Sequence, residues 1–200
     1  IFVNGLENIS QKIIKICNEL SIPTIVDPKS TNKDFWQNCT TIKPNADWAR
    51  SFCDKYDPEF KSGNKWESEM KFVSDMLNCK EVVLTDSGNG VGILDRDLEP
   101  HFSPSPSLSK NRPIIRSVIG AGDCFCAFFT MAKSLGFNLK SSVKIAFNGA
   151  SAYIEDKHNS PVTPYRFGRW FDPIRAKVVS LEQLVEIKKQ SPGKTWIWTN

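Results

Sequence analysis

Apolar residues follow two alternating patterns along most of this 200-residue chain. Ile9, Ile13, Ile16 and Leu20 stand at i, i+4, i+7 and i+11, and this spacing predicts a helix with one apolar stripe. A short apolar run at 24–26 comes next and predicts a buried strand. Helices that alternate with short strands are typical of layered α/β folds with a largely parallel sheet.

The same alternation continues to about residue 154. Short apolar runs predict strands at 40–42 and 114–118, and the residues 81–94 predict a hairpin with polar groups at its tip. Residues 54–64 and 99–112 are polar or proline-rich, which favours exposed connections. Three further helices are predicted from apolar residues at helical spacing: Trp66, Met70, Val73 and Leu77; Phe125, Phe128, Phe129, Ala132 and Leu135; and Val143, Phe147, Ala150 and Ile154.

A glycine turn, Gly120, Ala121, Gly122 and Asp123, joins the predicted strand at 114–118 to the next helix. Glycines let a backbone approach a ligand closely, and the first N–H groups of a helix point outward with its positive end, so this turn predicts an anion site. Asp123 is a poor ligand for an anion but is well placed to take a proton from a hydroxyl group as a phosphoryl group arrives. The four residues alone fit a plain turn with a helix-capping aspartate equally well.

Other polar residues follow the predicted strands directly, at the sheet edge where ligands collect in open α/β folds. Asp27 follows the first strand, Asn45 follows the second, and residues 86–90 form the tip of the hairpin. Two of these residues also fit a purely structural role: Asp27 fits a turn before Pro28, and Asn45 fits a helix N-cap.

Composition narrows the class of protein. Hydrophobic residues make up 40% and charged residues 24%, as in ordinary soluble domains, and no apolar run approaches the roughly 20 residues that cross a bilayer. The net charge of +4 is mild and the lysines are interspersed with acids, so neither nucleic acid nor membrane binding is expected. Six cysteines without a CxxC pair or a histidine at metal-ligand spacing predict reduced thiols, no metal site and a cytoplasmic location.

The C-terminal part of the chain departs from the α/β pattern. Residues 166–179 break the alternation, and 180–200 then predict a short helix followed by a strand. A lone helix and strand cannot bury their own apolar faces, so we expect residues 180–200 to begin a second, truncated domain after a linker at 166–179. We expect the sequence to be a fragment of a longer protein, because both of its ends look cut.

The order of these motifs resembles the C-terminal half of the ribokinase-like (PfkB) sugar kinases over about residues 1–165. The matching features are the segment 26–29, the Pro44–Asn45 turn, the Thr85-x-Ser87-x-x-Gly90 turn, the residues 120–123, and Asn148 in the following helix. Five motifs in the right order are much more specific than any one of them. The resemblance implies a three-layer α/β/α fold with a mostly parallel sheet, incomplete because the N-terminal half of the kinase domain is absent.

The resemblance also implies roles for these residues. Asp123 would be the general base, and Gly120, Ala121 and Gly122 would form the anion hole. The cofactors would be ATP and Mg²⁺, with no side chain assigned to the metal. The residues that would line the nucleotide site are Asn45, Thr85, Ser87, Gly90 and Asn148.

A narrower resemblance is to the bifunctional enzymes that join a heptose-7-phosphate kinase to a heptose-1-phosphate adenylyltransferase. The stretches that carry it are VDPKSTNKDFW with TTIKPN, residues 157–163, and AKVVSLEQL with GKTWIWTN. It implies a sugar phosphate substrate, namely D-glycero-D-manno-heptose 7-phosphate, which would be converted to the 1,7-bisphosphate in ADP-heptose biosynthesis. The oligomeric state stays open, with a homodimer as one candidate.

Two positions depart from the family pattern. The family's Asn-x-x-Glu motif ends here in Trp48, so an indole stands where a carboxylate would organise metal-bound water. The usual Asp-x-Thr before the glycine turn is here Ser117-Val118-Ile119. Two alternatives to the heptose kinase therefore stay open: a non-catalytic remnant that binds nucleotide or a partner, and a kinase for another sugar.

Overall fold

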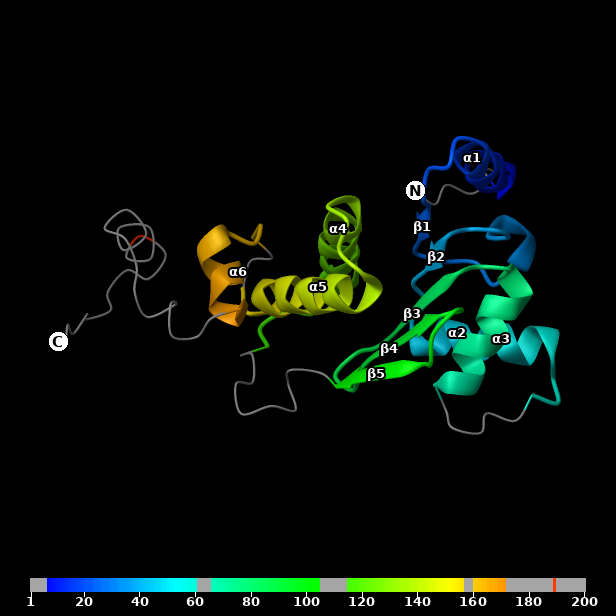
Figure 1. Ribbon diagram of the computed structural model, residues 1–200. Helices are drawn as coiled ribbons and strands as arrows, with labels where there is room; N and C mark the ends of the chain where they lie inside the picture. The colour runs from blue at the N-terminus through cyan, green and yellow to red at the C-terminus, as the bar shows by residue number, and fades with distance from the viewer. Residues whose placement is uncertain (1–6, 61–65, 105–114, 157–159, 172–188, 190–200) are drawn as a thin grey trace.

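Figure 1 shows the computed structural model, which describes residues 7–60, 66–104, 115–156, 160–171 and 189. Its helices are α1 (Glu7–Glu19), the 3₁₀ helix η1 (Lys33–Phe35), α2 (Ala46–Tyr56), α3 (Glu67–Leu77), α4 (Ala121–Ser134), α5 (Leu139–Ile154) and α6 (Pro164–Phe171). Its strands are β1 (Ile25–Val26), β2 (Thr41–Ile42), β3 (Glu81–Asp86), β4 (Gly90–Asp95) and β5 (His101–Pro104). No helix among the described residues is both long enough and apolar enough to cross a membrane.

The five strands form one mixed sheet in the order β1-β2-β3-β4-β5. The strands β1, β2 and β3 are parallel to one another, and Thr41 lies between Ile25 and Glu81 in the register. The predicted hairpin is confirmed, because β3 and β4 pair antiparallel from Glu81 with Asp95 to Asp86 with Gly90. The strand β5 adds a third antiparallel strand at the far edge.

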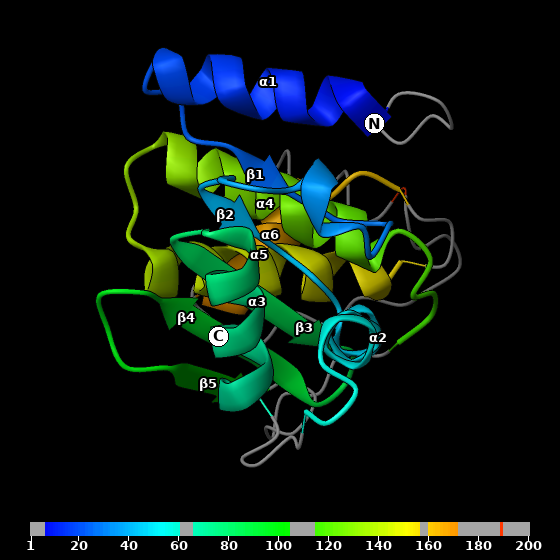
Figure 2. The same ribbon diagram turned by 90° about the vertical axis from the view of Figure 1, so that its right-hand side faces the viewer.

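Helices cover both faces of the sheet, which gives the three-layer α/β/α architecture expected from the sequence (Figure 2). On β3 the side chains alternate, so Val82 and Leu84 pack toward α2 and α3 while Val83 packs toward α4 and α5. Phe52 on α2 and Phe129 on α4 are fully buried on the two sides. The sheet is therefore a central layer between two separate apolar cores.

The expected strand at 114–118 is wrong for its described part. Residues 115–118 belong to no strand, and Ile115 and Val118 are exposed. The N–H groups of Arg116 and Ser117 donate to the Ile154 carbonyl at the end of α5, so this segment crosses a helix end and does not join the sheet. The β-branched residues gave the strand signal, but tertiary contacts decided the structure.

The region predicted as an exposed connection at 99–112 holds β5 in its first part, while residues 105–112 lie outside the described residues. Helix α6 spans the predicted boundary between residues 165 and 166. It packs on the α4–α5 layer, since the Phe167 ring stacks on Phe128 and the Arg166 guanidinium pairs with Asp156. The rest of the predicted linker lies outside the described residues, as does all of 180–200 except residue 189, so the second domain stays a prediction.

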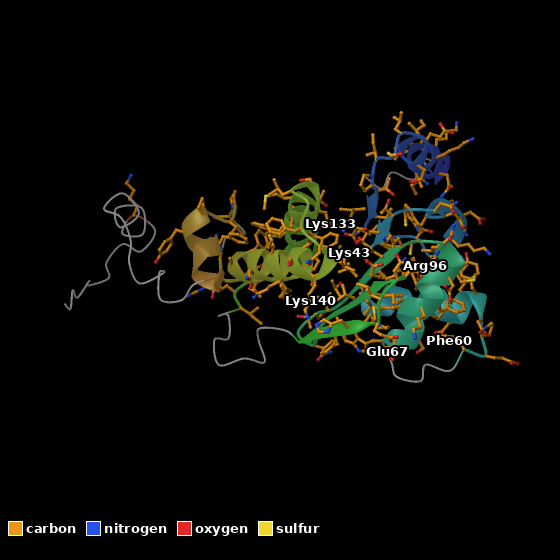
Figure 3. The ribbon with its side chains drawn as sticks, viewed as in Figure 1. Lys43, Phe60, Glu67, Arg96, Lys133 and Lys140 are labelled. Carbon is orange, nitrogen blue, oxygen red and sulfur yellow. The ribbon has the colours of Figure 1, made fainter. Side chains whose placement is uncertain are left out.

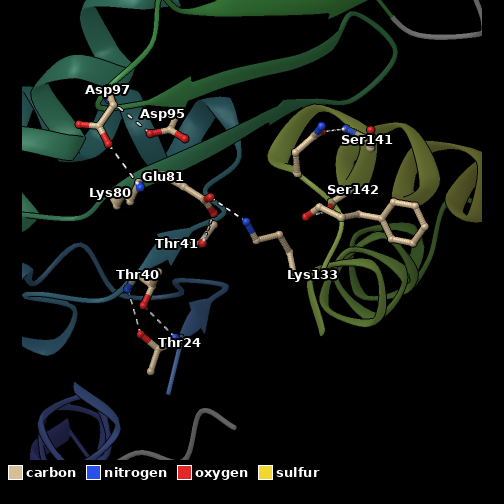
Figure 4. A network of polar contacts seen from close by, with 12 residues as sticks. Thr24, Thr40, Thr41, Lys80, Glu81, Asp95, Asp97, Lys133, Ser141 and Ser142 are labelled. Carbon is tan, nitrogen blue, oxygen red and sulfur yellow. Dashed lines mark hydrogen bonds and ion pairs between the residues drawn. The ribbon is translucent and has the colours of Figure 1, made fainter. Parts of the chain in front are cut away.

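A buried polar network fixes α4 against the sheet (Figure 4). The Glu81 carboxylate at the start of β3 accepts a hydrogen bond from Thr41 Oγ1 at 2.6 Å and forms an ion pair with Lys133 Nζ at 2.7 Å. Lys133 lies in the last turn of α4. Because buried polar groups are costly when they are left unpaired, this contact specifies how α4 sits on the sheet and hence where its first turn lies.

Candidate active site

The carboxyl ends of β1, β2 and β3 meet at one edge of the sheet because the three strands are parallel. Helix α2 begins at this edge directly after β2, and α4 also begins on this side of the molecule (Figure 2, right). The residues that follow the strands and the first turn of α4 therefore gather in one region, as expected for ligand sites in open α/β sheets.

Lys43 directly follows β2 and is the buried cation of this region. Its Nζ lies 3.2 Å from Asp27 Oδ1, and Lys29 Nζ lies 3.4 Å from the other oxygen of the same carboxylate. Only 4% of the Lys43 side chain is exposed, compared with 59% for Lys29. Figure 3 shows Lys43 between the sheet and the α4–α5 layer. A cation in this position would attract an anionic ligand to the strand ends.

The glycine turn before α4 is present as expected. Gly120 is the N-cap residue with φ +80°, a left-handed conformation that glycine adopts without strain. The Ala121 N–H donates to the Val118 carbonyl at 3.1 Å, so this amide is used within the turn. Within the described residues the Gly122 N–H has no acceptor, and Asp123 is exposed in the first turn of α4. The Gly120 and Asp123 N–H groups likewise have no backbone acceptor among the described residues, so the turn presents several free amides and a carboxylate at the positive end of the helix.

Cys126 lies one turn after Asp123 on α4, and its thiol is influenced by charges at the strand ends. Burial is the main cause that raises the pKa of this thiol, while the charge of Lys43 opposes the rise and the charges of Asp27 and Asp123 add to it. The Asp27–Lys43 pair and the start of α4 lie on the same side of the molecule. Sequence reasoning missed Lys43; its position directly after a buried strand was the signal that could have identified it.

Asn45 and Thr85 are neighbours at the same edge. The two residues form an isolated parallel bridge in which the Thr85 N–H donates to the Pro44 carbonyl at 3.0 Å. The Asn45 side chain accepts a hydrogen bond from the Trp48 N–H at 2.7 Å, so the predicted N-cap of α2 is confirmed. Capping occupies the side-chain oxygen of Asn45 and leaves its amide nitrogen exposed toward solvent.

The other predicted nucleotide residues are placed as follows. Ser87 has φ +45° and is exposed in the β3–β4 turn, and Gly90 has φ +134° where β4 begins. Asn148 lies in the middle of α5, on the opposite face of the sheet from α2, with 7% of its surface exposed. The structure joins Asn45 to Thr85 by a backbone bridge.

Trp48 occupies the core and not the sheet edge. It is 7% exposed, its ring stacks on Phe52 at 4.7 Å between centroids, and its indole N–H donates to the Ser30 carbonyl at 3.1 Å. Trp36 donates to the same carbonyl at 2.8 Å. No group of three or more metal-ligating side chains is present among the described residues. The position where the ribokinase-like pattern has a carboxylate is therefore apolar here.

Comparisons with known proteins agree with the resemblance expected from the sequence. The chain is 27% identical over 203 residues to the bifunctional protein HldE of Campylobacter concisus, a match that covers 97% of this chain and 40% of that protein. It is 29% identical over 146 residues to an uncharacterized sugar kinase of Buchnera aphidicola, which covers 72% of this chain and 43% of that protein. The chain thus spans about two fifths of the length of these curated relatives.

Among solved structures, the chain is similar to Arabidopsis thaliana ribokinase complexed with ribose and ATP, with a TM-score of 0.67 and 16% identity. This match covers 83% of the chain and 53% of the ribokinase. No family model matches the chain. The similarity in structure establishes the ribokinase-like α/β fold, and the sequence relatives confirm the predicted resemblance to ribokinase-like and HldE proteins.

Proposed function

We propose that this chain is part of an ATP-dependent carbohydrate kinase, which transfers the terminal phosphoryl group of ATP to a hydroxyl group of a sugar phosphate. The observation that carries the proposal is the exposed Asp123 carboxylate beside free backbone amides at the start of α4, on the side of the molecule where the buried Lys43 follows β2. A base, an anion-binding amide and a cation are the groups that phosphoryl transfer requires. The similarity to sugar kinases supports the same reaction.

In this reaction the sugar hydroxyl oxygen attacks the terminal phosphorus of ATP. The bond from that phosphorus to the ADP oxygen breaks, ADP leaves, and Asp123 takes the hydroxyl proton. The Gly122 amide and the positive end of α4 stabilise the charge on the transferred phosphoryl oxygens. Of the three predicted anion-hole residues, Ala121 donates its amide within the turn, while the Gly120 and Gly122 amides have no acceptor among the described residues and are free for this task.

ATP fits this edge, because the free amide and the cation match its phosphates, and we infer that its base and ribose lie along Asn45, Thr85, Ser87, Gly90 and Asn148. Bound with ATP, Mg²⁺ would neutralise phosphate charge. The described residues fit Mg²⁺ poorly as direct ligands, since they form no carboxylate cluster and Trp48 is buried in the core. We therefore assign no side chain to the metal.

The substrate that we propose is a heptose 7-phosphate, from the likeness to HldE over 97% of the chain. The enzyme would act in the cytoplasm without nucleic acid or membrane partners, as a monomer or a homodimer. We also infer that residues 180–200 begin a nucleotidyltransferase domain. A second candidate function, a remnant that binds nucleotide without chemistry, is favoured by the buried Trp48 at the position of the family carboxylate.

The decisive experiment uses Asp123→Asn in the protein expressed from its complete coding sequence. We expect the rate of ADP formation with ATP, Mg²⁺ and sugar to fall about 10²- to 10⁴-fold, the usual contribution of a general base. The matched control is Asp47→Asn, which removes another exposed carboxylate, on α2, and should leave the rate unchanged. Equal turnover in the Asp123→Asn and control variants contradicts the role of Asp123.

Calorimetry and a substrate panel separate the remaining candidates. Nucleotide binding by the unaltered protein without any ADP formation would favour the remnant. Where turnover occurs, heptose 7-phosphate is compared with ribose and fructose 6-phosphate. We expect the largest kcat/KM for heptose 7-phosphate, and a larger value for another sugar overturns the substrate assignment while leaving the kinase proposal intact.

A further inference from the structure

Two of the six cysteines, Cys39 and Cys79, precede neighbouring parallel strands at equivalent positions. Cys39 stands two residues before Thr41 of β2 and Cys79 stands two residues before Glu81 of β3, and Thr41 and Glu81 are partners in the register. Neighbouring strands lie about 4.8 Å apart, and a disulfide normally joins residues whose Cα atoms are about 4.4–6.8 Å apart. The spacing of the two strands is therefore one that a disulfide can span.

Contacts on both sides of the two cysteines hold their segments together. On one side, Asn78 Nδ2 donates to Asn38 Oδ1 at 2.7 Å. On the other side, the Lys80 N–H donates to the Thr40 carbonyl at 3.1 Å. Because the residues directly before and directly after each cysteine are joined across the two segments, the cysteines themselves lie side by side.

The same kind of turn precedes each cysteine. Asn38 has φ +62° and Asn78 has φ +50°, a left-handed conformation that asparagine adopts more readily than most residues. Both cysteine side chains belong to the apolar core on the α2–α3 side of the sheet, where Cys39 is 1% exposed and Cys79 is fully buried. Both are free thiols. Two adjacent thiols in one core, each set by its own turn, could form a bond with little movement of the backbone.

Arg96 directly follows β4 and lies at the same end of the sheet (Figure 3). Its guanidinium donates to Asn78 Oδ1 at 2.9 Å and to the Ser74 carbonyl at 2.8 Å, which holds it near Cys79. A hydrogen bond from the Cys39 thiol and the charge of Arg96 lower the pKa of the Cys79 thiol, although burial opposes this change. The same hydrogen bond, together with burial, raises the pKa of the Cys39 thiol. Cys79 is thus the thiol that ionises more readily, and the thiolate is the form that attacks an oxidant.

We propose that Cys39 and Cys79 form a reversible disulfide when the protein meets hydrogen peroxide, and that this bond links the start of β2 to the start of β3. The Cys79 thiolate attacks one peroxide oxygen, the O–O bond breaks, and the Cys79 sulfenic acid forms as hydroxide leaves. The Cys39 sulfur then attacks the Cys79 sulfur, so the S–S bond forms, the S–O bond breaks and a second hydroxide leaves. The two hydroxides take up the two thiol protons. Two thiols and one peroxide therefore give one disulfide and two water molecules, and the sulfurs lose the two electrons that the peroxide gains.

This bond would close the loop from 39 to 79, which contains β2, α2 and α3. A disulfide that closes a long loop stabilises a protein mainly by constraining the unfolded chain. Hydrogen peroxide is the oxidant because both thiols are buried, and a bulky disulfide reagent would not reach them. The inference rests on the pairing of β2 with β3 and does not depend on the proposed kinase activity.

The test treats the folded protein, expressed from its complete coding sequence, with hydrogen peroxide. The remaining thiols are then blocked and the disulfides are mapped by peptide mass spectrometry. We expect a pair of peptides joined through Cys39 and Cys79, which dithiothreitol separates. The thermal midpoint should rise by several degrees on oxidation and return on reduction. The control is Cys53→Ala, which removes another buried thiol, on α2, and should leave both the link and the shift unchanged.

Two variants assign the roles of the thiols. In Cys39→Ala the Cys79 sulfenic acid has no partner, so dimedone should label it when the oxidised protein is unfolded, whereas Cys79→Ala should leave Cys39 unlabelled. Arg96→Met should slow the formation of the link several-fold, and Arg96→Lys, which keeps the charge, should retain most of the rate. Mapping of the unaltered protein does not depend on how these variants fold. Peroxide treatment that yields no link between Cys39 and Cys79, or yields it only after unfolding, overturns the proposal, and so do links among the other cysteines in equal yield.

Discussion

Lys43 places its ammonium group 3.2 Å from Asp27 Oδ1 while 96% of its side chain is removed from solvent. The two residues directly follow neighbouring parallel strands, so strand register alone sets this contact. A buried lysine is costly unless it is paired, and Asp27 is shared with the exposed Lys29. Lys43, Lys29 and Asp27 together carry a net charge of +1 at the sheet edge, which an incoming phosphate could also use.

Replacing Lys43 by Met is expected to lower both stability and nucleotide binding. The unfolding free energy should fall by about 1–3 kcal/mol, less than for a fully buried pair because Asp27 is partly exposed. The Kd for ATP should rise at least about tenfold if Lys43 contacts phosphate. Denaturant titration and calorimetry measure the two effects. The control is Lys29→Met, which removes the other partner of Asp27 and should change neither quantity by much; an unchanged Kd in Lys43→Met argues against a phosphate contact.

Replacing each of the two glycines of the turn by alanine should change the stability of the protein in opposite ways. Gly120 has φ +80°, and a Cβ there would lie 2.8 Å from the Tyr153 hydroxyl oxygen, so Gly120→Ala should destabilise the fold by about 1–3 kcal/mol. A Cβ added at Gly122 would meet no atom within 4 Å, so Gly122→Ala should keep the stability or raise it slightly.

The two substitutions should also be distinguishable by their effects on phosphoryl transfer. Gly122→Ala places a methyl group beside the free amide, and we expect phosphoryl transfer to fall while the thermal midpoint stays constant. Adding Tyr153→Phe to Gly120→Ala should recover part of the lost stability, because the crowding oxygen is gone. If Gly122→Ala turns over as fast as the unaltered protein, close approach of a ligand to this turn is excluded.

Sequence patterns predicted those elements of the fold whose signals are local. The stripe from Trp66 to Leu77 and the cap at Asn45 appear as α3 and the start of α2, since helical spacing and capping depend on a few neighbouring residues. The strand expected at 114–118 failed because Ile115 and Val118 have strand propensity but the segment finds its backbone partner at Ile154. The apolar stripe expected on α1 is exposed. This could not be predicted, because periodicity shows that a face is apolar without showing what covers it.

In the candidate site, too, the sequence predicted the residues that depend on local signals and missed those that depend on long-range packing. Residues 120–123 were identified from glycine chemistry, and the structure keeps Asp123 exposed at a helix start. Lys43 was missed, since its burial depends on the packing of α4 over the strand ends, which is a long-range property. Trp48 was recognised as a departure from the family pattern, but only the structure shows that its indole belongs to the core.

Thiol chemistry provides a probe of the packing around the glycine turn. Burial raises the pKa of the Cys124 thiol from 9.0 to about 11, and the nearby Arg166 charge opposes the rise. The thiolate is the reactive form, so at pH 8 only about one molecule in a thousand reacts at a given moment. Alkylation of Cys124 by iodoacetamide should therefore speed up about tenfold per pH unit and level off near pH 11.

Peptide mass spectrometry follows this reaction, and Cys53 provides an internal comparison. Its thiol pKa is raised to about 12, mainly by burial, so its reaction should level off at still higher pH. Arg166→Gln removes the opposing charge and should shift the Cys124 profile to higher pH. A Cys124 profile that levels off near the ordinary thiol pKa of about 9 would show that the burial of this thiol does not persist in solution.

Trp48→Glu restores the family pattern in sequence but should not restore a metal site. The carboxylate would have to enter the space of an indole that stacks on Phe52 and donates to Ser30, so we expect the unfolding free energy to fall by about 3–5 kcal/mol. Trp48→Phe is the matched control: it keeps a stacked aromatic ring but loses the N–H donor and one ring of the indole, at a cost of about 1–3 kcal/mol. Denaturant titrations with and without Mg²⁺ measure these changes. The contrary result would be a Trp48→Glu protein that is as stable as Trp48→Phe and gains stability with Mg²⁺. It would show that the side chain at position 48 can turn toward the sheet edge and take the metal role that the buried indole excludes.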